Sequence, residues 1–414
     1  MRRPIGPAAR HLAAGVGLAL ALAACAAAPV PVPPVETTAA PTAAPASRAP
    51  SPSATRSPAD GPRQSDLGTE LDIGTLVGAA GDAVDEFASD GSSIIFASAA
   101  APDVARDDAA PDLWRLTPGP SAEPELIWRN PARDHTLARV GGDAGAVAFV
   151  DMPLTGERAW TFRFMARHET EARILDEHPG DADVPSLVPS FSVGEDRVVW
   201  TAFDRGPAGP VSQLLEASPP TWEPRVVLER PATEAEFWLP SLSGSLVAFT
   251  EVRYAADRLS DERHVYLMDL GDPDGRRRLD TSGRATMSLI VPGAVLWKEA
   301  DAGFNMFNWG RMYRFDLATE AITSVDSSPQ EYVNYPSAGG RFVAWHGADS
   351  FALGVYDHLL DEPRIVERSG NDVSLLRPHL AGDLLVWMRV VGSGPDNRAE
   401  LRYAFLPGAG ELRR

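Results

Sequence analysis

The chain has 414 residues, of which 44% are hydrophobic and 23% charged, an ordinary globular composition that suits one large β domain or two smaller domains. Its 57 acidic residues outnumber its 38 basic residues, so the surface repels polyphosphate and nucleic acid is excluded as a partner. The single cysteine excludes a disulfide framework, a cysteine-based zinc site and an iron–sulfur cluster.

Residues 1–24 have the features of a secretory signal peptide. Three arginines stand among the first ten residues, and residues 11–24 are almost wholly apolar. This apolar run is too short to cross a bilayer as a helix, which needs about 20 residues. We therefore exclude the segment from the folded protein.

The signal segment ends in Leu22-Ala23-Ala24-Cys25, which resembles the bacterial lipobox. The resemblance implies that Cys25 receives a diacylglycerol, becomes the new N-terminus and anchors the protein on the extracytoplasmic face of the cell membrane. The alternative is an ordinary signal peptide cut at an Ala-x-Ala site, with Cys25 incidental. Arg2-Arg3 leaves the choice between the general secretory and twin-arginine routes open.

Residues 25–66 are rich in Pro, Ala, Ser and Thr and show no apolar periodicity. Such a segment cannot bury enough surface to fold, so we expect a disordered tether.

One sequence pattern recurs seven times between residues 87 and 387. Each copy has a short apolar run, a turn that contains glycine, and a second apolar run that ends in an aromatic residue. The closing aromatics are separated by 53, 51, 49, 48, 48 and 42 residues, and they are Phe96, Phe149, Trp200, Phe249, Trp297, Trp345 and Trp387. Such even spacing is typical of a repeat architecture.

Each copy continues with a third alternating segment, and the first six copies also have a fourth. The third segments are residues 112–116, 160–165, 211–217, 264–270, 312–317, 353–358 and 399–405, and the fourth are 125–129, 172–175, 225–229, 276–279, 321–325 and 363–367. Four antiparallel strands in a unit of about 45–50 residues make a propeller blade. The sequence therefore predicts an all-β, seven-bladed β-propeller over residues 67–414.

The seventh copy lacks a clear fourth strand, because only residues 411–414 follow its third. Upstream of the first copy, residues 69–77 alternate like a strand, within an otherwise unassigned segment 67–82. We expect this strand to form the outer edge of the seventh blade and to close the ring. The alternative is that residues 69–77 extend the tether and residues 411–414 suffice.

The first copy, Phe87-Ala-Ser-Asp-Gly-Ser-Ser-Ile-Ile-Phe96, resembles the F-S-P-D-G-x-x-I-A-F repeat of TolB-type, WD-like propellers, also found in prolyl-oligopeptidase propeller domains. Residues 264–270 and 312–317 resemble the I-Y-V-M-D-L element that follows in that family. The resemblance implies a propeller fold and a similar style of binding. TolB has an N-terminal α/β domain where this chain has the tether, so its partners are not implied.

Catalytic motifs are missing from the sequence. There is no Gly-x-Ser-x-Gly elbow, no His-Glu-x-x-His and no phosphate-binding glycine loop. Asp272-Pro-Asp274-Gly275 resembles the start of a calcium loop, but we interpret it as the turn between the third and fourth strands of blade four. We therefore assign no catalytic residue, metal or cofactor and expect a monomer. A carboxylate pair assembled from different blades stays open.

Propeller loops that join strands two and three, or one blade to the next, emerge on one face around the central channel. Several of these loops combine aromatic residues with Asn or Arg, which suits a peptide or carbohydrate surface. The candidate binding residues are Phe304, Phe307, Trp309, Arg253, Tyr254, Trp238, Tyr332 and Asn334. The alternative is that these rings fill the channel or pack between blades.

These observations favour a lipid-anchored, non-catalytic propeller that binds a protein or a glycan at the bacterial cell envelope. The alternative is an extracytoplasmic enzyme, a glycoside- or lactone-active hydrolase with its site at the channel mouth. A purely structural spacer is the third hypothesis.

Overall fold

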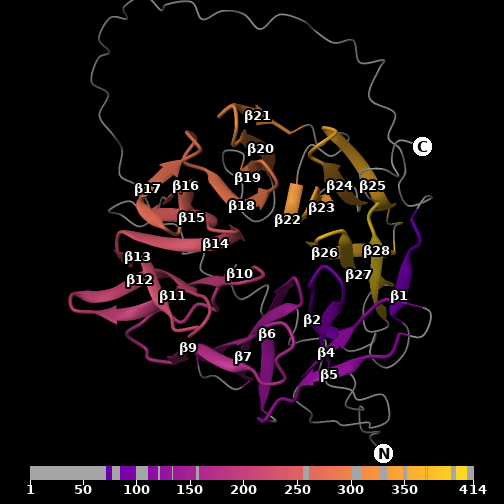
Figure 1. Ribbon diagram of the computed structural model, residues 1–414, viewed down its shortest axis with the longest axis horizontal. Helices are drawn as coiled ribbons and strands as arrows, with labels where there is room; N and C mark the ends of the chain where they lie inside the picture. The colour runs from indigo at the N-terminus through magenta and orange to yellow at the C-terminus, as the bar shows by residue number, and fades with distance from the viewer. Residues whose placement is uncertain are drawn as a thin grey trace, which may run out of the picture. The chain divides into compact units, whose positions relative to one another are not determined.

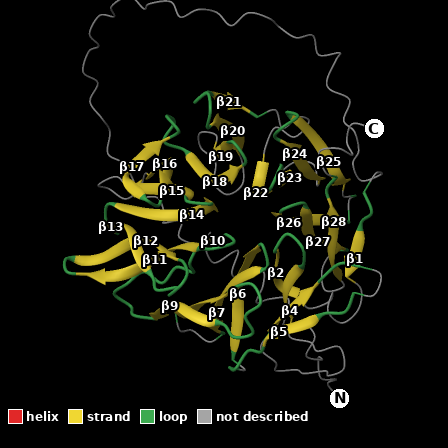
Figure 2. Cartoon of the chain, in the orientation of Figure 1, coloured by secondary structure: helices red, strands yellow, loops and turns green. Residues whose placement is uncertain are grey.

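The computed structural model describes most of the predicted propeller. The described residues are 71–76, 84–98, 111–119, 122–132, 134–154, 158–254, 261–300, 310–325, 333–347, 352–368, 370, 372–392 and 398–407. Cys25 and the predicted segments 1–24 and 25–66 lie outside them. All regular elements of the described part are strands (Figure 2), and none of it forms a helix with the length and hydropathy of a membrane span.

The strands form seven four-stranded antiparallel sheets, which confirms the predicted seven-bladed, all-β fold. Blades one and two contain β2 (Val84–Ser89), β3 (Ile94–Ser98), β4 (Asp112–Leu116), β5 (Glu125–Trp128), β6 (His135–Asp143), β7 (Ala146–Pro153), β8 (Ala159–Met165) and β9 (Arg173–Pro179). Blades three and four contain β10 (Phe191–Val193), β11 (Val198–Gly206), β12 (Gly209–Ala217), β13 (Arg225–Pro231), β14 (Ala235–Ser243), β15 (Leu246–Tyr254), β16 (Asp261–Asp269) and β17 (Asp272–Arg278).

Blades five and six contain β18 (Ala285–Val291), β19 (Ala294–Ala300), β20 (Gly310–Asp316), β21 (Ile322–Ser324), β22 (Val333–Gly339), β23 (Phe342–Gly347), β24 (Ala352–Asp357) and β25 (Glu362–Arg368). Blade seven contains β26 (Val373–Ala381), β27 (Leu384–Val391), β28 (Arg398–Phe405) and β1 (Gly74–Leu76). The first strand of each blade contacts the first strand of the next, and β26 contacts β2, so the blades close into a ring around a central axis (Figure 1).

The seventh blade combines the two ends of the described chain. β1 pairs antiparallel with β28, with Gly74 opposite Tyr403 and Leu76 opposite Leu401. The strand expected within residues 69–77 is thus observed over three residues, Gly74–Leu76, at the outer edge of this blade. Residues 411–414 lie outside the described residues.

The turn predicted at Asp272–Gly275 is wrong in position. β16 ends at Asp269 and β17 begins at Asp272, so the turn consists of Leu270 and Gly271. The side chain of Asp269 accepts a hydrogen bond of 2.8 Å from the Gly271 amide. A local carboxylate–amide bond of this kind stabilises a tight turn, and this turn directly precedes the acidic run that begins at Asp272.

The second strands carry the core because neighbouring blades cover both of their faces. All five residues of β3 are buried, whereas most residues of the outermost strand β17 are exposed. The seven closing aromatics are each at most 1% exposed. The hydrophobic clusters join adjacent blades: Ala248 and Val265 of blade four pack in one cluster with Trp297 and Phe315 of blade five. Burial of each large side chain contributes about 1.5–3 kcal/mol, so stability resides largely between blades.

A repeated hydrogen bond links the innermost strands of neighbouring blades. A side chain in one blade accepts a hydrogen bond from a backbone amide at the adjacent register position of the next blade. The pairs are Ser192 Oγ with Leu242 N at 3.1 Å, Ser241 Oγ with Ile290 N at 2.9 Å, Ser337 Oγ with Leu380 N at 2.9 Å, and His379 Nδ1 with Ser89 N at 3.0 Å. These bonds fix the inner strands that surround the axis.

Candidate functional site

The pairing of first and second strands places one residue of each blade at an equivalent position beside the axis. In every blade, the residue that precedes the closing aromatic pairs with a residue of the innermost strand. The equivalent position lies two residues before that partner on the innermost strand. The seven residues are Glu86, Arg139, Ser190, Leu239, Met287, Tyr335 and Arg377. We call this set the axial ring.

The backbone of the innermost strand is irregular at the axial ring. In blades four to seven the strand register shifts beside the ring residue. The ring residues of these blades have positive φ angles of 49°, 55°, 45° and 49°, at Leu239, Met287, Tyr335 and Arg377. A positive φ in a residue other than glycine is rare, and its recurrence at one register position marks a built feature.

Two members of the axial ring are exposed to solvent, whereas Met287 is buried. Tyr335 is 48% exposed and the Arg377 side chain is 52% exposed, although both belong to innermost strands. An innermost strand is covered by its own second strand and by the adjacent blades (Figure 1). The directions left open are the axis and the two faces of the propeller.

The axial ring is divided by chemistry into two arcs. Consecutive blades seven, one and two contribute Arg377, Glu86 and Arg139, which we call the charged arc. Blades four, five and six contribute the apolar arc, which consists of Leu239, Met287 and Tyr335.

Ion pairing and hydrogen bonds fix the charged arc. Arg377 Nη1 lies 2.7 Å from Glu86 Oε1. Arg139 Nη1 donates to the carbonyl oxygen of Pro189 at 3.0 Å and to Ser190 Oγ at 2.9 Å. Burial lowers the pKa of Arg139, while the charge of Glu86 raises that pKa and the charge of Arg377 lowers it further. The two guanidinium groups and the carboxylate therefore act on one another at one level of the axis.

Of the predicted binding residues, Trp238 lies next to the axial ring. It precedes the ring residue Leu239 on β14 and donates its indole N–H to Glu236 Oε2 at 3.0 Å. Asn334 precedes Tyr335 on β22, where its backbone pairs with His346.

Arg253 and Tyr254 lie at the end of β15 in blade four rather than in the ring. Arg253 Nε donates to Glu251 Oε1 at 2.5 Å, and its Nη2 donates to the Tyr266 hydroxyl at 2.9 Å. The hydrogen bond to Glu251 raises the pKa of Arg253. The four other predicted residues, Phe304, Phe307, Trp309 and Tyr332, lie outside the described residues.

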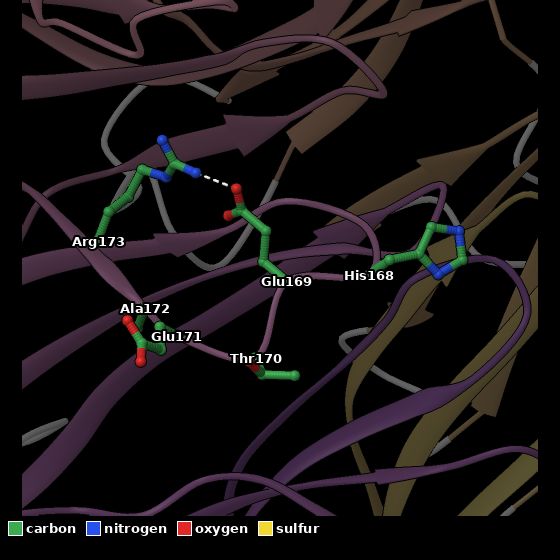
Figure 3. A pocket seen from close by; sticks show the side chains of 6 residues that line it. All are labelled: His168, Glu169, Thr170, Glu171, Ala172 and Arg173. Atoms are coloured by element: carbon green, nitrogen blue, oxygen red, sulfur yellow. Dashed lines mark hydrogen bonds and ion pairs between the residues drawn. The ribbon is translucent and has the colours of Figure 1, made fainter.

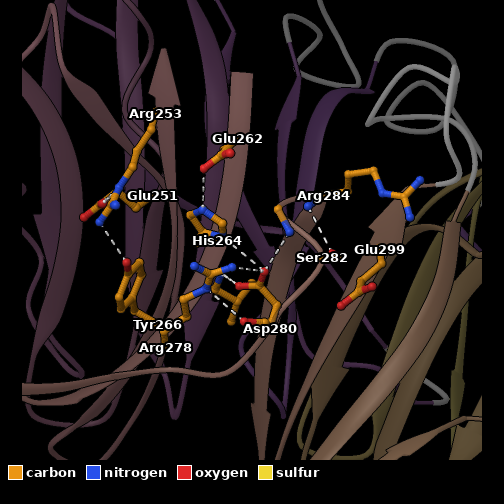
Figure 4. Close-up of polar contacts among 12 residues, drawn as sticks. Glu251, Arg253, Glu262, His264, Tyr266, Arg278, Asp280, Ser282, Arg284 and Glu299 are labelled. Atoms are coloured by element: carbon orange, nitrogen blue, oxygen red, sulfur yellow. Dashed lines mark hydrogen bonds and ion pairs between the residues drawn. The ribbon is translucent and has the colours of Figure 1, made fainter. Parts of the chain in front are cut away.

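Figure 4 shows Arg253 together with the other polar side chains of blade four and of the segment that follows it. His264 lies among these side chains: its Nδ1 lies 3.1 Å from Asp280 Oδ2 and its Nε2 lies 3.3 Å from Glu262 Oε2. Asp280 Oδ1 also accepts the Val265 amide at 2.8 Å, and both His264 and Asp280 are buried. Both imidazole nitrogens of His264 have carboxylate partners. The contact between His264 and Asp280 connects β16 to the segment that leads into blade five, so its role is structural. No group of His, Cys, Asp or Glu side chains in the described ranges could hold a metal ion.

A shallow depression lies at the turn between β8 and β9 of blade two (Figure 3). It is lined by residues 168–173, and an ion pair between Glu169 and Arg173 crosses it. All of its lining comes from a single hairpin turn, so the depression does not bring together groups from different blades. The axial ring, which does, is the candidate site.

Sequence reasoning missed the axial ring, although a weak signal was present. Pro240, Pro336 and Pro378 each stand nine residues before a closing aromatic and directly follow a ring residue. A proline that recurs at one offset in a repeat marks a special backbone position. Among the three residues that precede these prolines, Arg377 is charged, whereas Leu239 and Tyr335 are not.

No protein-family model matches the chain, and neither does any curated protein sequence. Solved structures resemble it at low identity. An oligogalacturonate lyase in complex with manganese is 16% identical with a TM-score of 0.50, and the match covers 81% of this chain and 91% of that chain. The β-propeller domain of the trilobed protease from Pyrococcus furiosus is 11% identical with a TM-score of 0.52, covering 79% and 94%.

A structure from a study of two prolyl endopeptidases is 12% identical with a TM-score of 0.52, covering 75% of this chain and 46% of that chain. At these identities the likeness shows the propeller fold alone. The neighbours are propeller proteins, and they do not identify a TolB-type or WD-repeat family.

Proposed function

We propose that this chain is a lipid-anchored, extracytoplasmic propeller that binds a glycan at its axial ring. The lipobox at Cys25 and the Pro-rich segment 25–66 support the anchoring and the location. The axial ring supports the binding, because it places one side chain from each of the seven blades at one register position, and two of them, Tyr335 and Arg377, are exposed.

The observation that carries this proposal is an exposed aromatic ring and an exposed arginine at equivalent positions on the innermost strands of adjacent blades, six and seven. Tyr335 is 48% exposed and the Arg377 side chain 52% exposed, on innermost strands where a merely structural residue would be buried. Sugars present both apolar ring faces and hydroxyl groups, which suits an aromatic ring beside hydrogen-bond donors.

The second candidate is a glycan-active propeller enzyme, and the comparisons favour it over a non-catalytic role. The chain covers 91% of an oligogalacturonate lyase, so a propeller of this extent accounts for nearly all of that enzyme. A prolyl-endopeptidase activity is not favoured, because the chain spans about half of the prolyl-endopeptidase structure and its sequence contains no Gly-x-Ser-x-Gly elbow.

Calorimetric titration of the mature chain with a panel of neutral and acidic oligosaccharides tests the proposal. We expect a member of the panel to bind, and Tyr335→Ala to weaken its binding at least about tenfold, because an aromatic contact at a site centre dominates affinity. Phe405→Ala is the matched control, because Phe405 is 50% exposed and lies on the outer part of blade seven.

Equal binding by the Tyr335 variant, or no binding by the wild-type chain, would overturn the proposal. Chromatography of the oligosaccharides after incubation with the chain distinguishes the binding module from the enzyme. Shortened products support the enzyme, whereas an intact ligand supports a binding module.

A further inference from the structure

We infer that the charged arc of the axial ring receives a carboxylate, so that the glycan is acidic and contains hexuronate units. This inference rests on the proposed function and specifies its ligand. It follows from the charges of the arc, from the groups that position its arginines, and from the apolar arc that adjoins it at blade six.

The charge balance of the arc is positive. Arg139 and Arg377 contribute two positive charges and Glu86 one negative charge, in a chain with a net charge of −19. The ionised groups that act on Arg139 are Glu86 and Arg377, and their effects oppose each other. Glu86 has the larger of these two effects on the pKa of Arg139, and Arg377 adds a second positive charge to the arc.

The Arg139 guanidinium is positioned in advance. Pro189 and Ser190 of the next blade accept hydrogen bonds from Nη1, at 3.0 Å and 2.9 Å. A guanidinium has five N–H donors in a planar fork that matches a carboxylate. A group held in this way binds an anion with little loss of conformational entropy.

The arc already holds one carboxylate of the protein itself. Glu86 Oε1 lies 2.7 Å from Arg377 Nη1, and the Arg377 side chain is about half exposed to solvent. A ligand carboxylate that approaches along the axis meets the same donors. Glu86 therefore competes with the ligand for Arg377.

The apolar arc determines the rest of the ligand. Leu239 and Met287 belong to blades four and five, and Met287 is buried, whereas Tyr335 of blade six is 48% exposed and adjoins blade seven, which carries Arg377. A hexuronate unit carries a carboxylate on a sugar ring with apolar faces, so it matches both arcs. A neutral sugar would match the apolar arc alone.

Titration of the full mature chain with trigalacturonate and with its methyl ester tests the inference, because esterification removes the charge of each carboxyl group and adds only a methyl group. The wild-type chain should bind the acid at least about tenfold more tightly than the ester, and added salt should reduce this preference. Arg377→Gln should abolish the preference. Glu86→Gln should tighten acid binding several-fold, because it removes the internal competitor.

The matched control is Arg277→Gln. Arg277 has a 47% exposed side chain and an ion pair of 2.7 Å to Glu320, closely similar to those of Arg377, but it lies on the outermost strand β17. Its replacement should leave the preference unchanged.

Equal affinity of the wild-type chain for the acid and the ester would overturn the inference while the proposed function stands. No binding of either compound, or of any neutral oligosaccharide, would overturn the proposed function itself. If Arg377→Gln fails to fold, as circular dichroism would reveal, the wild-type comparison and the opposite effect of Glu86→Gln still decide.

Discussion

His379 closes the ring of inner-strand hydrogen bonds and does so only as a neutral imidazole. Its Nδ1 accepts the Ser89 amide at 3.0 Å, across the junction between blade seven and blade one. The equivalent acceptors in blades three, four and six are serine hydroxyls, which do not titrate. Burial lowers the pKa of His379 from 6.5 to about 4.

This pKa predicts that the junction weakens in acid. Because the folded protein favours the neutral form, the stabilising contribution of His379 is complete above pH 6.5 and is lost as the pH falls to about 4. A shift of this size corresponds to about 3 kcal/mol. Urea unfolding at pH 7 and pH 4.5 should show a smaller acid loss for His379→Asn, whose amide oxygen accepts the same bond at both values.

The difference between the two proteins isolates His379, because burial also lowers the pKa values of His178, His346 and His358. An identical pH dependence of stability in the variant and the wild-type chain would show that His379 does not control the junction.

At the scale of elements, adjacent blades approach closely enough to exclude a methyl group. Gly339 lies at the end of β22, and a Cβ there would come within 2.7 Å of the Ala381 Cα of blade seven. The obstacle is backbone, which cannot rotate away. The contact between blades six and seven therefore depends on glycine at this position.

Gly339→Ala should lower the free energy of unfolding by about 1–3 kcal/mol, because overpacking forces the two blades apart. Gly119→Ala is the control, since a Cβ at Gly119 would meet nothing within 4 Å. Thermal unfolding of both variants measures the effect. Equal melting temperatures would show that the blades separate without strain.

Strands were predictable at this scale, and their bulges were not. Alternation and turn residues located the second, third and fourth strands, because both signals depend on neighbouring residues. The bulges beside Leu239 and Met287 depend on the fit of an inner strand against two blades, which a local pattern does not contain. The turn at Leu270-Gly271 was misplaced because an acidic, proline-containing segment that resembles a turn is part of β17.

At the scale of the whole molecule, the repeat predicted the number of blades but not the site. Seven copies with even spacing imply a closed ring, since each sheet needs a neighbour on both faces. Loop composition led to Trp238, Arg253 and Tyr254, of which Trp238 lies beside the axial ring. The charged arc joins residues 86, 139 and 377, and a charge cluster becomes visible only when the ring closes.

Hydrogen–deuterium exchange of the full mature chain, with and without saturating trigalacturonate, tests ligand binding at the axial ring most directly. Bound ligand should slow exchange in peptides that contain β2, β6, β22 and β26, which carry Glu86, Arg139, Tyr335 and Arg377. Peptides from the outermost strands β9, β13 and β17 should exchange as before. Protection confined to those outer strands, or to the depression at residues 168–173, would contradict binding at the axis.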